Sequence, residues 1–296
     1  MELIAKIIGM NTSDGMYNVV VRDVLSNQYN LKVSADNVCE LKIGHTYTFT
    51  YDVYDGVERS SNVVRNLEEV TNMPFDQQNE TLRMFYPQAP ISAEDAIKEV
   101  YSYINKIDNK VIKDITKTLI DRNKDLFFIY PAASKLHHAY VGGLAYHSIG
   151  MVHFADGFIE NYPYLNKDYI YAGILLHDIG KTIELTGIVN TEYTIKGQLL
   201  GHLVLGAMAI EDVSKELGYE NTEEVMILEH MLISHHGQPQ FGSAKKPMTA
   251  EALVLWYIDT IDSKFRVLGE ELEKTKPGEF TDNIGVLDRM KIYKAR

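Results

Sequence analysis

Histidine is concentrated in one part of this chain. Nine of its ten histidines lie between positions 137 and 236, and most stand in or beside apolar strings with helical spacing. The candidates in chain order are His147, the pair His177-Asp178, His202, the pair His235-His236 and Asp259. Imidazole nitrogens and carboxylate oxygens bind borderline and hard divalent metals. We therefore expect a helical fold organised around a metal site.

Each candidate is weak by itself, because a lone histidine on an apolar helix is most often a structural residue. The set as a whole changes this interpretation. The chain has one cysteine, Cys39, which excludes both a thiolate site and an internal disulfide framework. An N/O site with room for water is therefore favoured.

The first 70 residues have a different pattern, rich in β-branched and aromatic residues and interrupted by turn signals such as Asp55-Gly56. Strands are predicted over 3–9, 17–25, 29–33 and 46–54. Four or five short strands in fewer than 80 residues suit a small barrel, most simply an OB-fold. The predicted fold is thus multidomain, with an all-β N-terminal barrel followed by an all-α domain. The expected boundaries are 1–75 for the barrel, 76–91 for a linker rich in proline, and 92–296 for the helical domain.

The predicted strand 46–54 alternates strictly, so Tyr47, Phe49 and Tyr51 share one face. Those rings either stack on the bases of a nucleic acid or fill the barrel, and the sequence leaves both readings open. Residues 1–80 carry six Lys/Arg against twelve Asp/Glu, which does not favour nucleic-acid binding.

The order His, His-Asp, His, His-His, Asp resembles the HD-domain superfamily of metal-dependent phosphohydrolases. More narrowly, three strings resemble the HD-domain 3′-5′ exoribonucleases of the YhaM type. These strings run from His138 through Gly143 to Ser148, from His177 to Lys181, and from Tyr257 to Asp262. The resemblance covers nearly the whole chain and implies an OB-fold joined to an HD domain.

The resemblance also implies two divalent metal ions. The first would be held by His147, His177, Asp178 and Asp259, and the second by His202, His235 and His236, with Asp178 bridging. Manganese is the expected metal, with iron, cobalt and zinc as alternatives. Asp178 and Lys181 are the predicted catalytic residues. Lys181 would contact a phosphate oxygen or protonate the leaving oxygen, although a lysine near a helix end can also serve only the helix dipole. The string implies substrate contacts by His138, Tyr140 and Gly143, and Asp262 has no assigned role.

The implied activity is hydrolysis of single-stranded RNA from its 3′ end to nucleoside 5′-monophosphates, with single-stranded DNA left open as a substrate. The alternative is a small-molecule phosphodiesterase or nucleotide phosphohydrolase, which the net charge of −12 favours. A binding module without catalysis is the third class, and the intact ligand set speaks against it. The start of the chain does not resemble a signal peptide and no run is long enough for a membrane helix, so we expect a cytoplasmic protein.

Overall fold

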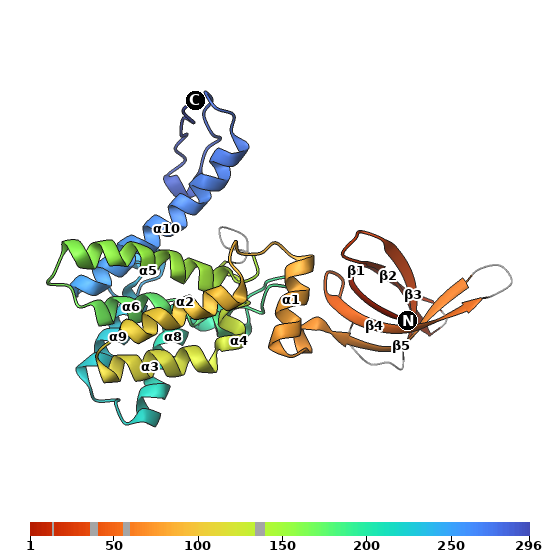
Figure 1. The fold of residues 1–296 in the computed structure, drawn as a ribbon, viewed down its shortest axis with the longest axis horizontal. Coiled ribbons are helices and arrows are strands. Elements are labelled where there is room, and N and C mark those ends of the chain that lie inside the picture. Colours follow the sequence, from red (N-terminus) through yellow and green to blue (C-terminus); the bar gives the residue numbers. More distant parts are fainter. Residues whose placement is uncertain (14, 36–40, 56–59, 134–139) are drawn as a thin grey trace. The chain divides into compact units, whose positions relative to one another are not determined.

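The computed structural model describes residues 1–13, 15–35, 41–55, 60–133 and 140–296. The chain divides into two compact units, Met1–Gln88 and Ala89–Arg296 (Figure 1). The first unit is built mainly from strands and the second from helices. The predicted fold class, a β-barrel followed by an all-α domain, is confirmed.

Five strands close the barrel in the order β1-β2-β3-β5-β4. They are β1 (Glu2–Ser13), β2 (Met16–Arg22), β3 (Gln28–Ser34), β4 (Thr46–Asp55) and β5 (Ser60–Glu69). Neighbouring strands pair antiparallel except β3 and β5, which are parallel, and β1 pairs with β4 to complete the closure. This is the partly Greek-key arrangement of an OB-type barrel.

The aromatic residues of β4 point into the barrel. Tyr47 and Phe49 are completely buried and Tyr51 is 8% exposed, within a core of valine, leucine and isoleucine from the other strands. The Tyr47 hydroxyl accepts a hydrogen bond from the Lys42 backbone N–H. The two readings of these rings are therefore decided: they fill the core and are not a stacking surface.

A helix lies where the sequence predicted a linker. After the short helix η1 (Val70–Asn72), helix α1 (Phe75–Phe85) occupies most of 76–91 and belongs to the first unit. Its Leu82 is buried, and the Tyr86 hydroxyl donates to the carbonyl of Gly44 in the barrel. Prolines flank this helix without interrupting it, because Pro74 immediately precedes its first residue.

The second unit contains the helices that carry the histidines. In chain order they are α2 (Ala93–Lys106), α3 (Lys110–Arg122), α4 (Lys124–Phe127), α5 (Gly143–Asn161), α6 (Lys167–Leu176), α7 (Lys181–Glu184), α8 (Ile195–Leu217), α9 (Glu223–Ser234), η2 (Pro239–Phe241), α10 (Ala250–Lys274) and η3 (Gly285–Leu287). Several begin at a side-chain cap. Ser92 caps α2 by accepting the Asp95 backbone N–H, and Asn109, Thr194 and Thr249 cap α3, α8 and α10.

Helix α6 is at the centre of this unit. It packs against α2, α3, α5, α9 and α10 (Figure 1). Every residue from Ile170 to Leu176 is buried, as expected for a helix that is apolar on all sides. Its C-terminal end, at His177, therefore lies deep in the protein.

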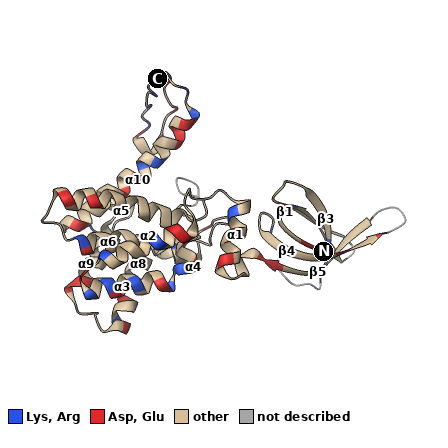
Figure 2. Cartoon of the chain, in the orientation of Figure 1, with Lys and Arg blue, Asp and Glu red and all other residues tan. Residues whose placement is uncertain are grey.

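The basic residues of α2 and α3 are largely paired with acids. Lys98 pairs with Glu94, Lys117 with Asp121, and Arg122 with Glu216. Figure 2 shows positive and negative residues interspersed along α3. These contacts favour solvated helix faces over a row of phosphate contacts. Among the described residues, no helix is long and apolar enough to span a membrane.

Candidate metal centre

The seven predicted ligands come from five helices and meet at one place. His147 lies in α5, His177 caps α6 and Asp178 follows it, His202 lies in α8, His235 and His236 follow α9, and Asp259 lies in α10. Six of these seven fall into two groups in which the ligand atoms lie within 4.8 Å of one another. One group is His147, His177 and Asp259, and the other is His202, His235 and His236.

The first group is compact and mostly buried. His147 Nε2 lies 3.2 Å from Asp259 Oδ1, and the rings of His147 and His177 have centroids 5.2 Å apart. Both imidazoles are almost completely buried. In the second group the ring centroids of His235 and His236 are 4.5 Å apart, and those of His202 and His236 are 5.2 Å apart.

Asp178 lies between the groups. Its Oδ2 is 3.2 Å from His177 Nε2, and its Oδ1 is 3.3 Å from His202 Nε2 and 3.9 Å from His235 Nε2. One carboxylate oxygen therefore faces each group. This is the position that a bridging carboxylate would occupy between two metal ions.

The hydrogen bonds of the five histidines fix their tautomers. His177, His235 and His236 each direct Nδ1 at a backbone carbonyl, of Ile174, Leu232 and Phe241, at 2.7, 2.7 and 2.8 Å. A carbonyl oxygen only accepts, so the proton of each neutral ring is on Nδ1 and the lone pair is on Nε2. His147 and His202 direct Nδ1 at the carboxylates of Asp262 and Glu184, at 2.8 and 3.0 Å, so the neutral form of each ring also has its lone pair on Nε2.

The lone pairs that result have no hydrogen-bond partner. Among the described residues, the buried side-chain atoms without one include His177 Nε2, His202 Nε2, His235 Nε2 and Asp178 Oδ1. All four are acceptors, and they lie together. Leaving one such group unsatisfied costs about 1–3 kcal/mol, so four at one place require an explanation. A divalent cation supplies it, and a set of imidazoles and carboxylates without thiolate fits Mn, Fe, Co or Zn.

The electrostatics keep both carboxylates ionised. Burial alone would raise the pKa of Asp178, but its electrostatic interactions with the His177 imidazole and the Lys181 ammonium hold that pKa well below its ordinary value. Asp259 has its pKa lowered as well, because its interaction with the adjacent His147 imidazole outweighs its burial. Burial and the neighbouring imidazoles lower the pKa of His235, which keeps that ring neutral and able to bind metal.

His147 has the opposite balance. Burial alone would lower the pKa of His147. The carboxylates of Asp259 and Asp262 have the larger effect, and they raise this pKa to about 9. The same carboxylates attract any cation at Nε2, so a metal ion competes with the proton for that lone pair.

Comparison with known proteins identifies this arrangement. The HD domain model matches residues 144–264, the segment that carries the candidate ligands. The 3′-5′ exoribonuclease YhaM of Bacillus subtilis (strain 168) is 39% identical over 243 residues, which cover 82% of this chain and 76% of that protein. YhaM of Bacillus pumilus (strain SAFR-032) is 40% identical over 232 residues, 78% of this chain and 74% of that protein. YhaM of Geobacillus sp. (strain WCH70) is 43% identical over 210 residues, 71% of this chain and 64% of that protein.

The chain belongs to the YhaM exoribonuclease family. The family predicted from the three sequence strings is thus confirmed, as is its HD domain.

Two buried acids that support the histidines have no counterpart among the predicted YhaM-type ligands. Glu184 accepts from both the backbone N–H and Nδ1 of His202, each at 3.0 Å. Asp262, whose role the sequence left open, accepts from His147 and is itself paired with Arg266. Asp262 could be noticed by its spacing from Asp259, whereas nothing in the sequence marks Glu184.

Glycines bring these elements close together. Gly201 has φ 70°, which kinks α8 immediately before His202. At Gly180 an added Cβ would lie 2.2 Å from the His202 carbonyl oxygen. At Gly237, where φ is +77°, it would lie 1.9 Å from the Trp256 ring. The turn after His235-His236 therefore rests directly on the indole.

Lys181 reaches the same centre. Its Nζ donates to the Ala132 carbonyl at 2.6 Å and lies 2.7 Å from Asp178 Oδ2. Burial alone would lower the pKa of Lys181. The charge of Asp178 has the larger effect, so this pKa is above its ordinary value. Two of its three N–H groups thus have acceptors, and the third is available for another group.

The string before α5 forms the start of that helix. Gly142 has φ 76°, its N–H donates to the Ile129 carbonyl, and the Gly143 N–H donates to Tyr140. Both N–H groups are therefore already used within the protein. Tyr140 is half-buried, with its pKa raised by burial. His138 lies outside the described residues.

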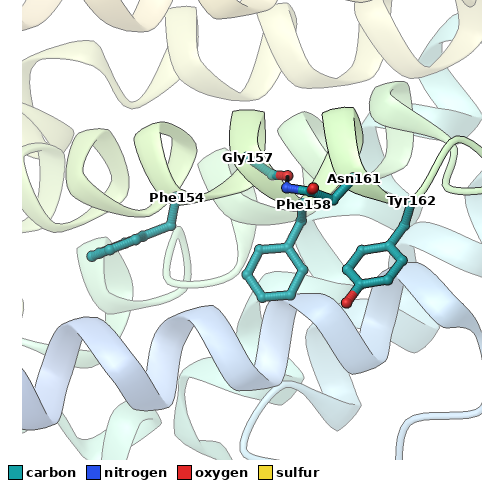
Figure 3. Close-up of a pocket in the computed structure, with 5 residues that line it drawn as sticks. All are labelled: Phe154, Gly157, Phe158, Asn161 and Tyr162. Carbon is teal, nitrogen blue, oxygen red and sulfur yellow. Dashed lines mark hydrogen bonds between the residues drawn. The ribbon is translucent and has the colours of Figure 1, made fainter.

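A pocket of about 680 Å³ opens onto the metal centre. Its walls include Ala132, His147, Asp178, Lys181, His236, Phe241, Trp256, Tyr257, Asp259, Thr260, Ser263, Lys264 and Val286. Tyr140 and Gly143 are not among them. A second pocket, of about 400 Å³, lies along α5, where Phe154, Phe158 and Tyr162 project from the same side of the helix (Figure 3). None of the residues that line it is ionisable near pH 7, so the chemistry belongs to the first.

Proposed function

We propose that this chain is a metal-dependent 3′-5′ exoribonuclease that removes nucleoside 5′-monophosphates from single-stranded RNA, using two divalent ions held by the seven residues of the centre. The observation that carries the proposal is the cluster of four buried acceptors without partners, His177 Nε2, His202 Nε2, His235 Nε2 and Asp178 Oδ1. It lies in the HD domain of a chain related to YhaM exoribonucleases. Single-stranded DNA is a second substrate to be tested.

The two groups give each ion its own ligands. In this proposal His147, His177 and Asp259 hold one ion, His202, His235 and His236 hold the other, and Asp178 offers one oxygen to each. When bound, divalent metals supply an activated water nucleophile at neutral pH and offset charge on the transferred phosphoryl group. Manganese is the metal we expect, and the imidazole and carboxylate ligands would suit iron, cobalt or zinc as well.

The protein's own residues supply orientation. The carboxylates of Asp262 and Glu184 and three backbone carbonyls hold the imidazoles with Nε2 facing inward. Lys181 is held by Ala132 and Asp178 and lines the pocket, and its remaining N–H would bind a non-bridging phosphate oxygen.

The barrel is proposed to bind the RNA strand and guide it to the metal centre. This role rests on the resemblance to YhaM-type proteins, since the β4 aromatics are buried and the unit is acidic. Contacts would then come from exposed polar groups of the barrel and not from Tyr47, Phe49 or Tyr51.

One assay tests the proposal. Purified protein with Mn²⁺ is given 5′-labelled single-stranded RNA, the matching DNA, cyclic dinucleotides and nucleoside triphosphates in parallel. A descending ladder on RNA is the expected result. Turnover of the cyclic dinucleotides or triphosphates without a ladder would replace the exoribonuclease with a small-molecule phosphohydrolase.

A further inference from the structure

Helix α10 forms one wall of the pocket at the metal centre. Tyr257, Thr260 and Lys264 line the pocket at spacings of three and four residues, so they make one stripe along the helix. Asp259, a candidate metal ligand, lies within that segment. The stripe therefore adjoins the metal centre within one pocket.

Tyr257 presents an aromatic ring at this wall. It is 46% exposed, and its ring stacks on Trp256 with centroids 5.0 Å apart and an interplanar angle of 24°. Trp256 is fixed in turn by the close approach of Gly237. Phe241 lines the same pocket from η2 and is 63% exposed, while its carbonyl holds His236. Supported aromatic rings at a solvent-open pocket are suited to stack on a nucleobase.

Lys264 presents a positive charge on the same stripe. Within the described part of the chain it makes no hydrogen bond or ion pair, and it is half-buried in the pocket wall. Other basic residues of α10 are paired: Arg266 with Asp262 and Lys274 with Glu271. Because no carboxylate among the described residues neutralises it, the ammonium group of Lys264 is available to a phosphate that enters the pocket.

We infer that this wall is the binding subsite for the 3′-terminal nucleotide, with Tyr257 stacking on its base and Lys264 contacting a phosphate of the strand. The inference rests on the proposed exoribonuclease function, because cleavage from the 3′ end leaves one nucleotide beyond the scissile bond. The pocket, about 680 Å³, is within the range of about 300–1,000 Å³ typical of small-molecule sites. Stacking is indifferent to base identity, so the subsite accepts all four nucleotides.

The base contact is tested by a coupling experiment. The Mn²⁺-loaded wild type and Tyr257→Ala are each given RNA with an ordinary or an abasic 3′-terminal residue. Each change alone raises KM by about 5- to 150-fold, and the two together raise it no further, because they remove the same contact. Tyr257→Phe keeps the ring and restores KM. Metal content is measured for every variant and stays at the wild-type value.

The matched control is Tyr164→Ala, which removes a tyrosine that is 76% exposed and does not line the pocket. It leaves KM for both RNAs unchanged. Two results would overturn the base contact: a combined KM effect equal to the product of the two single effects, or a wild-type KM for Tyr257→Ala. Neither result affects the RNA ladder, so the proposed function would stand.

The phosphate contact is tested by salt. Lys264→Met raises KM and lowers the slope of log KM against log salt by about 0.7, the value for one phosphate contact with a single strand. Lys274→Met, on the same helix outside the pocket, leaves the slope unchanged. An unchanged slope in Lys264→Met would remove this residue from the subsite.

If the wild type gives no ladder on RNA, the proposed function fails and the subsite is tested separately. Binding of adenosine 5′-monophosphate to the Mn²⁺-loaded protein is then titrated by calorimetry. Weaker binding by Tyr257→Ala supports a nucleotide subsite without exonuclease activity. The subsite is overturned if the wild type and Tyr257→Ala bind adenosine 5′-monophosphate equally, or if neither protein binds it.

Discussion

Asp178 Oδ1 lies 3.3 Å from His202 Nε2, and neither atom has a hydrogen-bond partner among the described residues. In the neutral ring the contact with Glu184 places the proton of His202 on Nδ1, so the lone pair on Nε2 faces the oxygen of Asp178. Two acceptors at this distance repel each other unless a cation lies beside both. This contact is the clearest sign that the centre is built for metal.

The two supporting acids should act on different ions. Glu184→Gln weakens the hydrogen bond that orients His202, and Asp262→Asn does the same for His147. Each change should lower the affinity of one ion by roughly 10–100-fold and leave the other unchanged. Competition with a metal-binding dye measures both affinities. Equal loss of both ions in either variant would show that the groups are not separate sites.

Gly237→Ala should destabilise the helical unit more than an ordinary glycine substitution does. Gly218 is the matched control, because its φ of +75° is close to the +77° of Gly237 but an added Cβ there meets nothing within 4 Å. Gly218→Ala should cost about 1–2 kcal/mol of folding free energy through backbone strain alone. Gly237→Ala should cost about 1–3 kcal/mol more, because the Cβ also meets the Trp256 ring. Chemical unfolding in excess chelator compares the two, and equal costs would remove Trp256 from the explanation.

Lys181→Met should keep the fold and lower kcat by roughly 10²–10⁴-fold, because it removes a positioned charge at the phosphate. If Lys181 acts through its charge, Lys181→Arg should recover part of the rate. If it acts as a proton donor, Lys181→Arg should not recover the rate, since guanidinium hardly deprotonates. Single-turnover cleavage of a short RNA at saturating Mn²⁺ gives the rates. Near-wild-type turnover by Lys181→Met with full metal content would leave the residue only its bonds to Ala132 and Asp178.

A truncated chain beginning at Ala89 tests the role of the barrel. The helical unit contains all seven candidate ligands, so it should keep its metal and cleave a dinucleotide. Affinity for long RNA should fall, and binding should depend less on salt. Circular dichroism first establishes that the truncated chain is folded. Equal KM of both chains on long RNA would mean that the barrel does not hold the strand.

The candidate ligands could be found from sequence because they stand in short local strings. His177-Asp178 and His235-His236 each end an apolar helix and precede a glycine, a pattern visible without tertiary structure. Glu184 could not be found this way. Its role depends on the Gly201 kink and on the packing of α7 against α8, which only the folded chain reveals.

The fold shows the same division. The strands β1 to β4 follow from alternation and turn residues. The pairing of β5 with β3 is parallel and joins strands that are distant in sequence, so no turn residues predict it. Burial of Tyr47 and Phe49 also could not be read from their alternation, because one face of a strand looks the same whether it meets a barrel core or a ligand.

The number of ions tests the account most directly. Metal analysis of the purified wild type at saturating Mn²⁺ should give two ions per chain. Asp178→Asn removes the charge that faces both groups, so it should lose both ions and lower hydrolysis of RNA by more than about 10³-fold. His202→Ala should lose mainly one ion. One ion or none in the wild type, or two ions retained by Asp178→Asn, would contradict the bridged two-metal centre.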